Sequence, residues 1–294
     1  MVKSQLKFCG LERHFSDYSK ARFAVLPVPY EKTTTYAKGT AKGPKAIMEA
    51  SCKLELYDEE LDSTPAESGI ATLKPLVIRD KPEIMVRKVK DACLKILDDG
   101  KFPILLGGEH SISVGFLLAL KERVPDVSVL QFDAHADLRE SYRGSRYNHA
   151  CVMARIRENV ECVQVGIRSI SDEESELVKK LRSDKTLFFA KDVLEGDCTK
   201  DIINRLSENV YITFDLDCMD PSIMPSTGTP EPGGLGWYDV LRILKAVTSA
   251  KNVVGFDVME LCPKPNSEAS DFTAAKLAYK MLGYVNQRFF IDNV

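Results

Sequence analysis

Short apolar stretches typical of buried strands alternate with amphipathic stretches typical of helices along nearly the whole chain. The strand type is predicted at residues 22–28, 102–106, 127–132, 160–165, 187–189, 209–214 and 253–258. The helical type is predicted from residue 44 and at residues 82–97, 114–121, 173–181, 200–208, 238–248 and 272–285. This alternation predicts an α/β fold with a mainly parallel sheet covered by helices on both faces. No linker, repeat or low-complexity segment divides the chain, so we expect one domain over residues 1–294.

The composition narrows the class of protein. Hydrophobic residues make up 44% of the 294 positions, which is enough for a full core and excludes a disordered chain. Forty basic and 43 acidic residues give a net charge of -3, which offers no electrostatic case for binding nucleic acid or an anionic membrane. The first seven residues lack the apolar core of a signal peptide, and no apolar run approaches the roughly 20 residues of a membrane span. We therefore expect a soluble, cytoplasmic protein.

The eight cysteines are scattered, and no two of them form a Cys-x-x-Cys pair. In a cytosolic chain of this size they are interpreted as free thiols and not as a disulfide framework or a zinc ribbon. Cys151 and Cys218 lie beside the motifs described below, and we interpret both as small apolar fillers.

Three side chains that can bind a metal stand at every second position directly after the strand predicted at residues 127–132. They are Asp133, His135 and Asp137, and alanines separate them. If the extended geometry persists past Phe132, side chains two residues apart point the same way, so these three would converge on one side. The alternative is a solvated turn after a strand, because short acidic motifs have many chance matches.

Two further segments carry similar side chains after predicted strands. Asp215 and Asp217 repeat the spacing of two after residues 209–214, although an Asx-turn that ends a strand is a common alternative. His110 follows Gly107-Gly108, and glycines at a strand end allow another backbone to approach closely. A single histidine in such a place is more often a capping or core residue than a ligand.

Electrostatics favours a metal site over the alternatives of a solvated turn, an Asx-turn and a capping or core histidine. Ligands of parallel α/β sheets bind beyond the carboxyl ends of the strands, where all these residues are expected. Four aspartates gathered there would raise one another's pKa values, and no Lys or Arg lies within residues 133–137 or 215–217 to compensate. Two divalent cations would neutralise the four carboxylates, with the two histidines as neutral ligands and room for a bridging water. Such a donor set fits Mn²⁺ best, with Zn²⁺, Fe²⁺ or Co²⁺ as alternatives.

Two more residues are candidates for chemistry. His149 lies in the loop after the Asp-x-His-x-Asp motif, and Glu260 follows the strand predicted at residues 253–258. An imidazole with an ordinary pKa of about 6.5 is suited to passing protons near neutral pH. A glutamate at a strand end could hold a cationic substrate. Neither role follows from spacing alone, and a surface position is the default for both.

Together these motifs resemble those of the ureohydrolases, the binuclear manganese enzymes that include arginase, agmatinase and formiminoglutamase. The likeness covers residues 107–111, 133–137, 214–217 with 220–221, and 227–235. It implies a three-layer αβα fold with a mainly parallel sheet of about eight strands. It implies that two Mn²⁺ ions are held by His110, Asp133, His135, Asp137, Asp215 and Asp217. It also implies His149 as proton shuttle and Glu260 as guanidinium anchor.

Within that family, residues 25–30, 54–58 and 166–169 resemble the agmatinase branch, as does Glu231-Pro232. Arginases carry an Asn that helps to bind the α-carboxylate where this chain has Arg139, which disfavours arginase without excluding it. The resemblance thus implies hydrolysis of agmatine to putrescine and urea. Aminopropylagmatine is an equally reasonable substrate, and arginase, guanidinobutyrase and formiminoglutamase activities are further alternatives.

The resemblance implies a mechanism in which Asp137 holds an attacking hydroxide, Glu260 orients the cationic head and His149 protonates the leaving amine. It also suggests a homotrimer or hexamer whose partner is a small guanidino compound. A binuclear phosphoesterase is disfavoured because its Gly-Asn-His motif is absent, and a serine hydrolase because there is no Gly-x-Ser-x-Gly elbow. A non-catalytic metal-binding protein is the most remote alternative.

Overall fold

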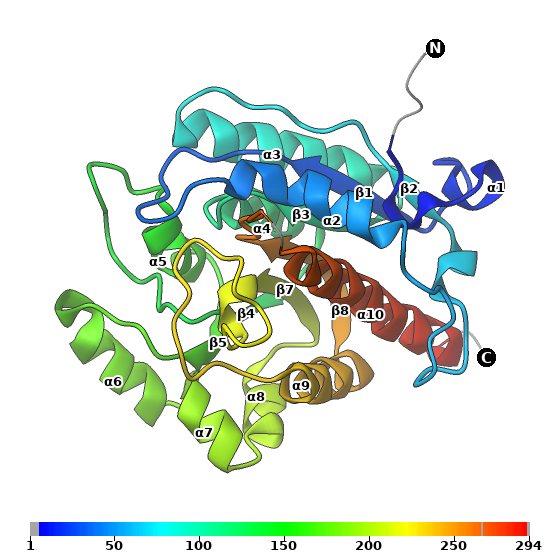
Figure 1. Ribbon diagram of the computed structural model, residues 1–294. Helices are drawn as coiled ribbons and strands as arrows, with labels where there is room; N and C mark the ends of the chain where they lie inside the picture. Colours follow the sequence, from blue (N-terminus) through cyan, green and yellow to red (C-terminus); the bar gives the residue numbers. More distant parts are fainter. Residues whose placement is uncertain (1–5, 266, 293–294) are drawn as a thin grey trace.

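The computed structural model describes residues 6–265 and 267–292, and its centre is one eight-stranded sheet (Figure 1). All strand pairings are parallel, in the order β2-β1-β3-β8-β7-β4-β5-β6. The strands are β1 Phe23–Val28, β2 Ile70–Thr72, β3 Phe102–Gly107, β4 Val127–Phe132, β5 Cys162–Ile167, β6 Leu187–Phe189, β7 Asn209–Asp215 and β8 Asn252–Met259. The expected parallel sheet of about eight strands is confirmed.

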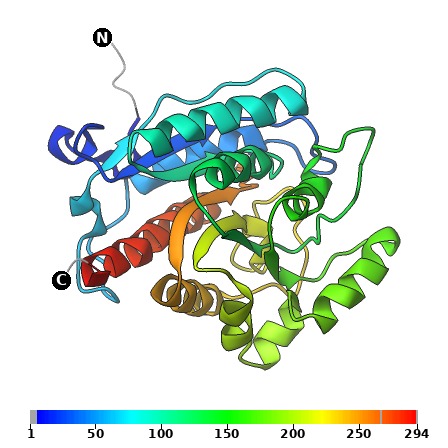
Figure 2. The ribbon, with the colours of Figure 1, turned by 180° about the vertical axis from the view of Figure 1, so that it is seen from behind.

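Helices cover both faces of the sheet, as Figures 1 and 2 show from opposite sides. One face packs against α2 (Gly43–Ser51), α7 (Ala190–Glu195), α8 (Thr199–Arg205), α9 (Trp237–Ala250) and α10 (Glu268–Asp292). The other face packs against α3 (Pro82–Asp98), α4 (Ile112–Arg123), α5 (Val152–Arg157) and α6 (Ser175–Ser183). The short α1 (Arg13–Ser16) lies beside β2. The three-layer αβα arrangement is therefore also confirmed.

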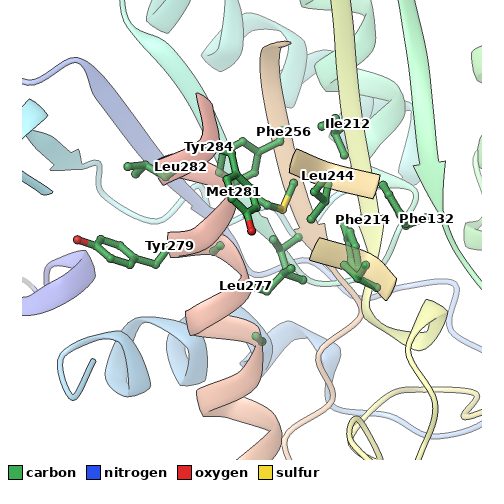
Figure 3. Packing of buried hydrophobic residues seen from close by; sticks show 14 of the residues in the cluster. Phe132, Ile212, Phe214, Leu244, Phe256, Leu277, Tyr279, Met281, Leu282 and Tyr284 are labelled. Atoms are coloured by element: carbon green, nitrogen blue, oxygen red, sulfur yellow. The ribbon is translucent and has the colours of Figure 1, made fainter. Parts of the chain in front are cut away.

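The strands divide their side chains between two cores with a period of two. In β4, Leu130 and Phe132 belong to the core under α9 and α10, whereas Val127 and Val129 belong to the core under α3 and α4. Phe132 stacks on Phe214 of β7 with 4.9 Å between ring centroids, and Figure 3 shows the two side chains next to each other on the side of the sheet where Leu244 of α9 lies. Because both faces are buried, the strands are mainly apolar on both faces, which made them recognisable in the sequence.

The long helices follow the sequence pattern closely. The helix expected at residues 82–97 is α3, with Pro82 in its first turn and Gly100 in a left-handed conformation just after its end. Four short α-helices and strands were not predicted, namely α1, β2, α5 and α7. Each has three to six residues, which is too short for a periodic pattern to emerge. No helix in the described ranges is long and apolar enough to cross a membrane.

Candidate metal centre

The candidate ligands gather at the carboxyl ends of four consecutive strands in the order β3, β8, β7 and β4. His110 follows β3 closely, Glu260 directly follows β8, Asp215 ends β7 and Asp133 directly follows β4. Parallel strands present their carboxyl ends at one edge, so four separate sequence motifs meet there. Gly108 is required for this meeting, because a Cβ at that position would lie 2.0 Å from the carbonyl oxygen of Tyr30.

The first group surrounds one nitrogen of His110. Its Nδ1 lies 3.1 Å from Asp133 Oδ2, 3.3 Å from Asp137 Oδ2 and 3.3 Å from Asp215 Oδ2. All four side chains are buried, and Nδ1 has no hydrogen-bond partner of acceptable geometry among the described residues. A buried nitrogen aimed at three carboxylates is the arrangement that a cation between them would explain.

The second group is built around His135 and shares Asp133 with the first. His135 Nδ1 lies 3.0 Å from Asp217 Oδ2 and 3.6 Å from Asp133 Oδ1. In each of two sets, His110–Asp133–Asp137 and Asp133–His135–Asp217, one ligand atom per residue lies within 4.8 Å of the others. The two oxygens of one carboxylate thus face two adjoining sites, as in a two-metal centre.

A buried network holds His110 from behind. Its Nε2 lies 2.9 Å from Thr213 Oγ1, and Thr213 donates to Asp257 Oδ1 at 2.9 Å. Ser113 and Tyr211 also donate to the Asp257 carboxylate. This network fixes the ring so that Nδ1 faces the carboxylates, which is the support that metal-binding histidines normally have.

The backbone brings the ligands together differently from the expectation. β4 ends at Phe132, beyond which His135 forms an isolated parallel bridge with Ser169, and Asp137 has a φ of 53°. Asp133 Oδ1 accepts from the backbone N–H of His135 at 2.6 Å, and Asp215 Oδ1 accepts from that of Asp217 at 2.9 Å. Asp133, His135 and Asp137 do converge on one cavity, as expected, but turns and not a continued strand bring them there. The Asx-turn alternative for residues 215–217 is correct, and it coexists with the cluster because the turns at Asp133 and Asp215 each leave Oδ2 facing His110.

The electrostatics of the cluster call for positive charge. Burial raises the pKa of Asp137 to about 7, and repulsion by Asp133 adds to this while His110 opposes it. Burial and the neighbouring Asp217 and Asp133 raise the pKa of Asp215 well above its usual range. Divalent cations would remove this repulsion, so the donor set fits two of them.

One cavity of about 150 Å³ opens onto both groups. Among the described residues that line it are the six candidate ligands, His149 and Glu260, together with Thr34, Thr35, Tyr36, Ala37, Arg139, Tyr142, Ala150, Gly228 and Thr229. The structure therefore brings together all eight residues predicted from the sequence as metal ligands or catalytic residues. Cys151 and Cys218 are fully buried, and neither is in this lining.

His149 and Glu260 are held by contacts that the sequence did not reveal. His149 begins a short turn, His149–Cys151, and its backbone N–H donates to Thr33 Oγ1 at 3.0 Å. Burial, and then the positive charges of His135 and His110, lower the pKa of His149 to about 4. Glu260 has a φ of 64° and accepts the backbone N–H of His110 through Oε1 at 2.7 Å. Burial raises the pKa of the Glu260 carboxyl well above its usual range, although that hydrogen bond opposes it.

Sequence reasoning missed Thr33 and Glu109. Thr33 contacts both the Glu109 carboxylate and the back of His149. Thr33 Oγ1 donates to Glu109 Oε1 at 2.9 Å. Thr33 lies in the Thr-rich loop after β1, which carried no recognisable motif. Glu109 lies inside the Gly-Gly-Glu-His-Ser motif but was not assigned a role. Only the fold brings these residues, 76 positions apart, into contact.

Comparison with known proteins agrees with this geometry. A family model described as the arginase family matches residues 21–283. An N(1)-aminopropylagmatine ureohydrolase of Synechocystis sp. is 40% identical over 279 residues, which cover 92% of this chain and 90% of that protein. An agmatinase of Pyrococcus horikoshii is 37% identical over 272 residues, which cover 91% of this chain and 93% of that protein.

A solved structure, the agmatine ureohydrolase of Thermoplasma volcanium, is similar along its whole length. It superposes with a TM-score of 0.87 at 32% identity, covering 100% of this chain and 98% of that one. The sequence and the fold thus lead to the same group of proteins. The chain belongs to the arginase family, within its agmatinase branch.

Proposed function

We propose that this protein hydrolyses the guanidino group of agmatine, yielding putrescine and urea, with two divalent cations of which Mn²⁺ fits best. The observation that carries the proposal is the pair of adjoining ligand groups that share Asp133 in one cavity with His149 and Glu260. The similar agmatinases and aminopropylagmatine ureohydrolases support a guanidino substrate.

The six candidate ligands divide between the two cations. His110, Asp137 and Asp215 would hold one, His135 and Asp217 the other, and Asp133 would contribute to both. Four carboxylates, two imidazoles and no thiolate favour a hard to borderline ion such as Mn²⁺. When bound, two such ions would lower the pKa of a shared water towards neutrality and so make hydroxide available near pH 7.

Glu260 is suited to bind the guanidinium head. Its buried carboxylate lines the cavity, and its Oε1 is fixed by the backbone N–H of His110. A cationic head would pair with this carboxylate through charge-assisted hydrogen bonds, which are stronger than neutral ones. Since Glu260 and the ligand His110 are joined directly, binding at Glu260 would place the guanidinium carbon beside the ligand groups.

Asp137 and His149 would form the hydrogen bond to the hydroxide and transfer the proton to the leaving amine, respectively. Asp137 lies beside His110, and its carboxylate would hold the attacking hydroxide by a hydrogen bond. The amine is a poor leaving group unless protonated, and His149, which lines the same cavity, is the candidate donor. Because burial favours its neutral form, His149 would carry a proton only transiently, as a shuttle does.

Aminopropylagmatine is a second candidate, because the relative of 40% identity carries that name. The cavity wall includes Tyr36, whose exposed fraction of 78% places it where a longer tail would leave the cavity. An aromatic ring at that position suits the ammonium groups of a polyamine tail. Arg139 is ion-paired with Glu173, and its guanidinium lies 4.7 Å from the centroid of the Tyr142 ring. The paired carboxylate partly neutralises the Arg139 charge and so reduces its repulsion of a cationic tail.

A substrate panel tests the proposal. The Mn²⁺-loaded protein would be assayed with agmatine, aminopropylagmatine, arginine, guanidinobutyrate and formiminoglutamate, measuring urea or formamide release. We expect the highest kcat/KM with agmatine, or with aminopropylagmatine if the longer tail is recognised. Preference for arginine or guanidinobutyrate would contradict the assignment of a cationic tail. Inactivity on the whole panel with full metal occupancy would overturn the proposed function.

A further inference from the structure

The Thr33 hydroxyl lies at the centre of a small hydrogen-bond network behind His149. Thr33 Oγ1 is 2.9 Å from Glu109 Oε1, 3.0 Å from the backbone nitrogen of His149 and 3.2 Å from His149 Nδ1. Thr33 is not among the residues that line the cavity, so the network reaches His149 from the side away from substrate.

The direction of each hydrogen bond follows from the atoms involved. The Glu109 carboxylate receives the backbone N–H groups of Lys32 and Thr33 on Oε2, and the hydroxyl of Ser111 on Oε1. Backbone N–H groups can only donate, so the carboxylate is acting as an acceptor, and Thr33 gives its single hydroxyl hydrogen to Oε1.

The Thr33 oxygen can then only accept from His149. One lone pair takes the backbone N–H of His149, and the other faces Nδ1. A neutral imidazole carries one hydrogen, on either nitrogen. The contact between Nδ1 and Thr33 is a hydrogen bond only if the hydrogen is on Nδ1. The Nε2 atom then bears the lone pair, and it lies 3.5 Å from the hydroxyl of Thr35, which lines the cavity.

We infer that Glu109 positions His149 through the Thr33 hydroxyl, and that this contact fixes the tautomer with hydrogen on Nδ1 and the lone pair on Nε2. The inference rests on the proposed function, in which His149 is the proton shuttle. Nε2 then takes up a proton from solvent water and releases it to the leaving amine nitrogen, while Nδ1 keeps its own hydrogen bonded to Thr33. Thr33 and Glu109 touch neither substrate nor the reacting atoms and are positioning residues.

The same network connects the shuttle to the metal site. Glu109 precedes the candidate ligand His110, and its backbone N–H donates to the carbonyl oxygen of Tyr30 at 2.9 Å. The loop after β1 is therefore held to the end of β3 at both its backbone and its side chains. This explains how a residue on a loop, His149, keeps a fixed distance from ligands on the strand ends.

A pair of substitutions at Thr33 tests the inference by kinetics. Thr33→Val keeps the shape and removes the hydroxyl, and we expect kcat to fall about tenfold to a hundredfold, with KM and metal content close to wild type. Thr33→Ser keeps the hydroxyl and should recover most of kcat. Thr40→Val is the matched control, because the buried Thr40 hydroxyl in the same loop has no hydrogen-bond partner among the described residues. Equal loss in the Val and Ser variants, or unchanged kcat in Thr33→Val, would overturn the inference.

A second measurement does not depend on activity. The ¹⁵N chemical shifts of protonated and unprotonated ring nitrogens differ widely, so NMR of histidine-labelled, Zn²⁺-loaded protein reports the tautomer. The chain has four histidines, and the signal that disappears in His149→Asn identifies His149. We expect hydrogen on Nδ1 in wild type and in Thr33→Ser, and a mixture in Thr33→Val. Hydrogen on Nε2 in wild type would refute the positioning role.

The two readouts separate this inference from the proposed function. If the wild-type protein has the Nδ1–H tautomer but leaves every guanidino compound intact, the inference about the network stands and the proposed function is refuted. If the enzyme is active but its Thr33→Val variant behaves as wild type in both measurements, the proposed function stands and the inference is refuted.

Discussion

Asp133 Oδ2 lies 3.1 Å from His110 Nδ1, although the two residues follow strands that are not neighbours in the sheet. His110 follows β3 and Asp133 follows β4, and both β8 and β7 lie between those strands. The loops after the outer two strands therefore bend toward each other over the ends of the inner two. Because the inner ends bear Glu260 and Asp215, one close contact defines a site with contributions from all four strands.

The shared position of Asp133 predicts how metal content responds to substitution. Asp133→Asn should lower the bound Mn²⁺ by about two equivalents per chain, because its oxygens face both groups. His135→Asn should lower it by about one, because His135 contacts only the second group. Elemental analysis after dialysis gives the stoichiometry, and equal losses in the two variants would contradict a shared ligand.

His149→Asn should lower kcat by roughly 10²–10⁴-fold, because the leaving amine loses its proton donor. Metal content should stay at the wild-type level, since His149 is in neither ligand group. Steady-state kinetics and elemental analysis check the two parts. His14→Asn is the control, because the His14 side chain is 59% exposed and is not part of the cavity lining. Loss of metal in parallel with activity would instead place His149 among the ligands.

Glu260→Gln should weaken binding of the guanidinium head and cost about 2–3 kcal/mol in kcat/KM, the strength of hydrogen bonds to charged groups. The amide oxygen can still accept the backbone N–H of His110, so the fold should be preserved. Kinetics with agmatine and thermal unfolding measure the two effects. Glu231→Gln, a change in a loop residue that does not line the cavity, should leave both nearly unchanged.

Lys280→Met should destabilise the protein by about 3–5 kcal/mol, because it leaves a buried carboxylate without its cation. Lys280 is 2% exposed and donates to Asp58 Oδ1 at 2.9 Å, and Asp58 is fully buried. Urea unfolding at pH 7 measures the change. Lys45→Met, at an exposed pair with Glu49, should change stability by less than about 1 kcal/mol. A double variant that adds Asp58→Asn should recover part of the loss, and strict additivity would contradict the pairing.

The Glu60 carboxylate should make stability depend on pH in the acid range. Burial alone would raise its pKa, but hydrogen bonds from Lys245, Lys280 and Tyr284 outweigh this and lower the pKa to about 2. Because the pKa is lower in the folded state, the ionised Glu60 carboxylate stabilises the protein. This stabilisation is fully present above about pH 4.5 and is lost as the pH falls toward 2. The difference in unfolding free energy between wild type and Glu60→Gln should therefore shrink from pH 6 to pH 3. Urea unfolding in the presence of a chelator excludes metal release, and a constant difference would contradict this account.

Some features of the fold were readable from the sequence because each depends on residues close together in the chain. The run at residues 127–132 is apolar on both faces, and it forms β4 with the expected bounds. Pro82 and Gly100 mark the ends of α3 by local conformational preference. The motif residues were recognisable for the same reason, since the spacing of Asp133, His135 and Asp137 is contained in five consecutive positions.

Only the tertiary structure decided which residues meet. Strand spacing gave the wrong reason for the convergence of the aspartates, which comes from Asx-turns and from the left-handed conformation of Asp137. Glu109, Thr33 and His149 form one network across 116 positions of sequence, and no local pattern encodes such a contact. The strand order places β3 beside β8 and β4 beside β7, and packing of the whole chain selects that order. The sequence by itself therefore determined the side chains available for chemistry, and the packed sheet determined their partners.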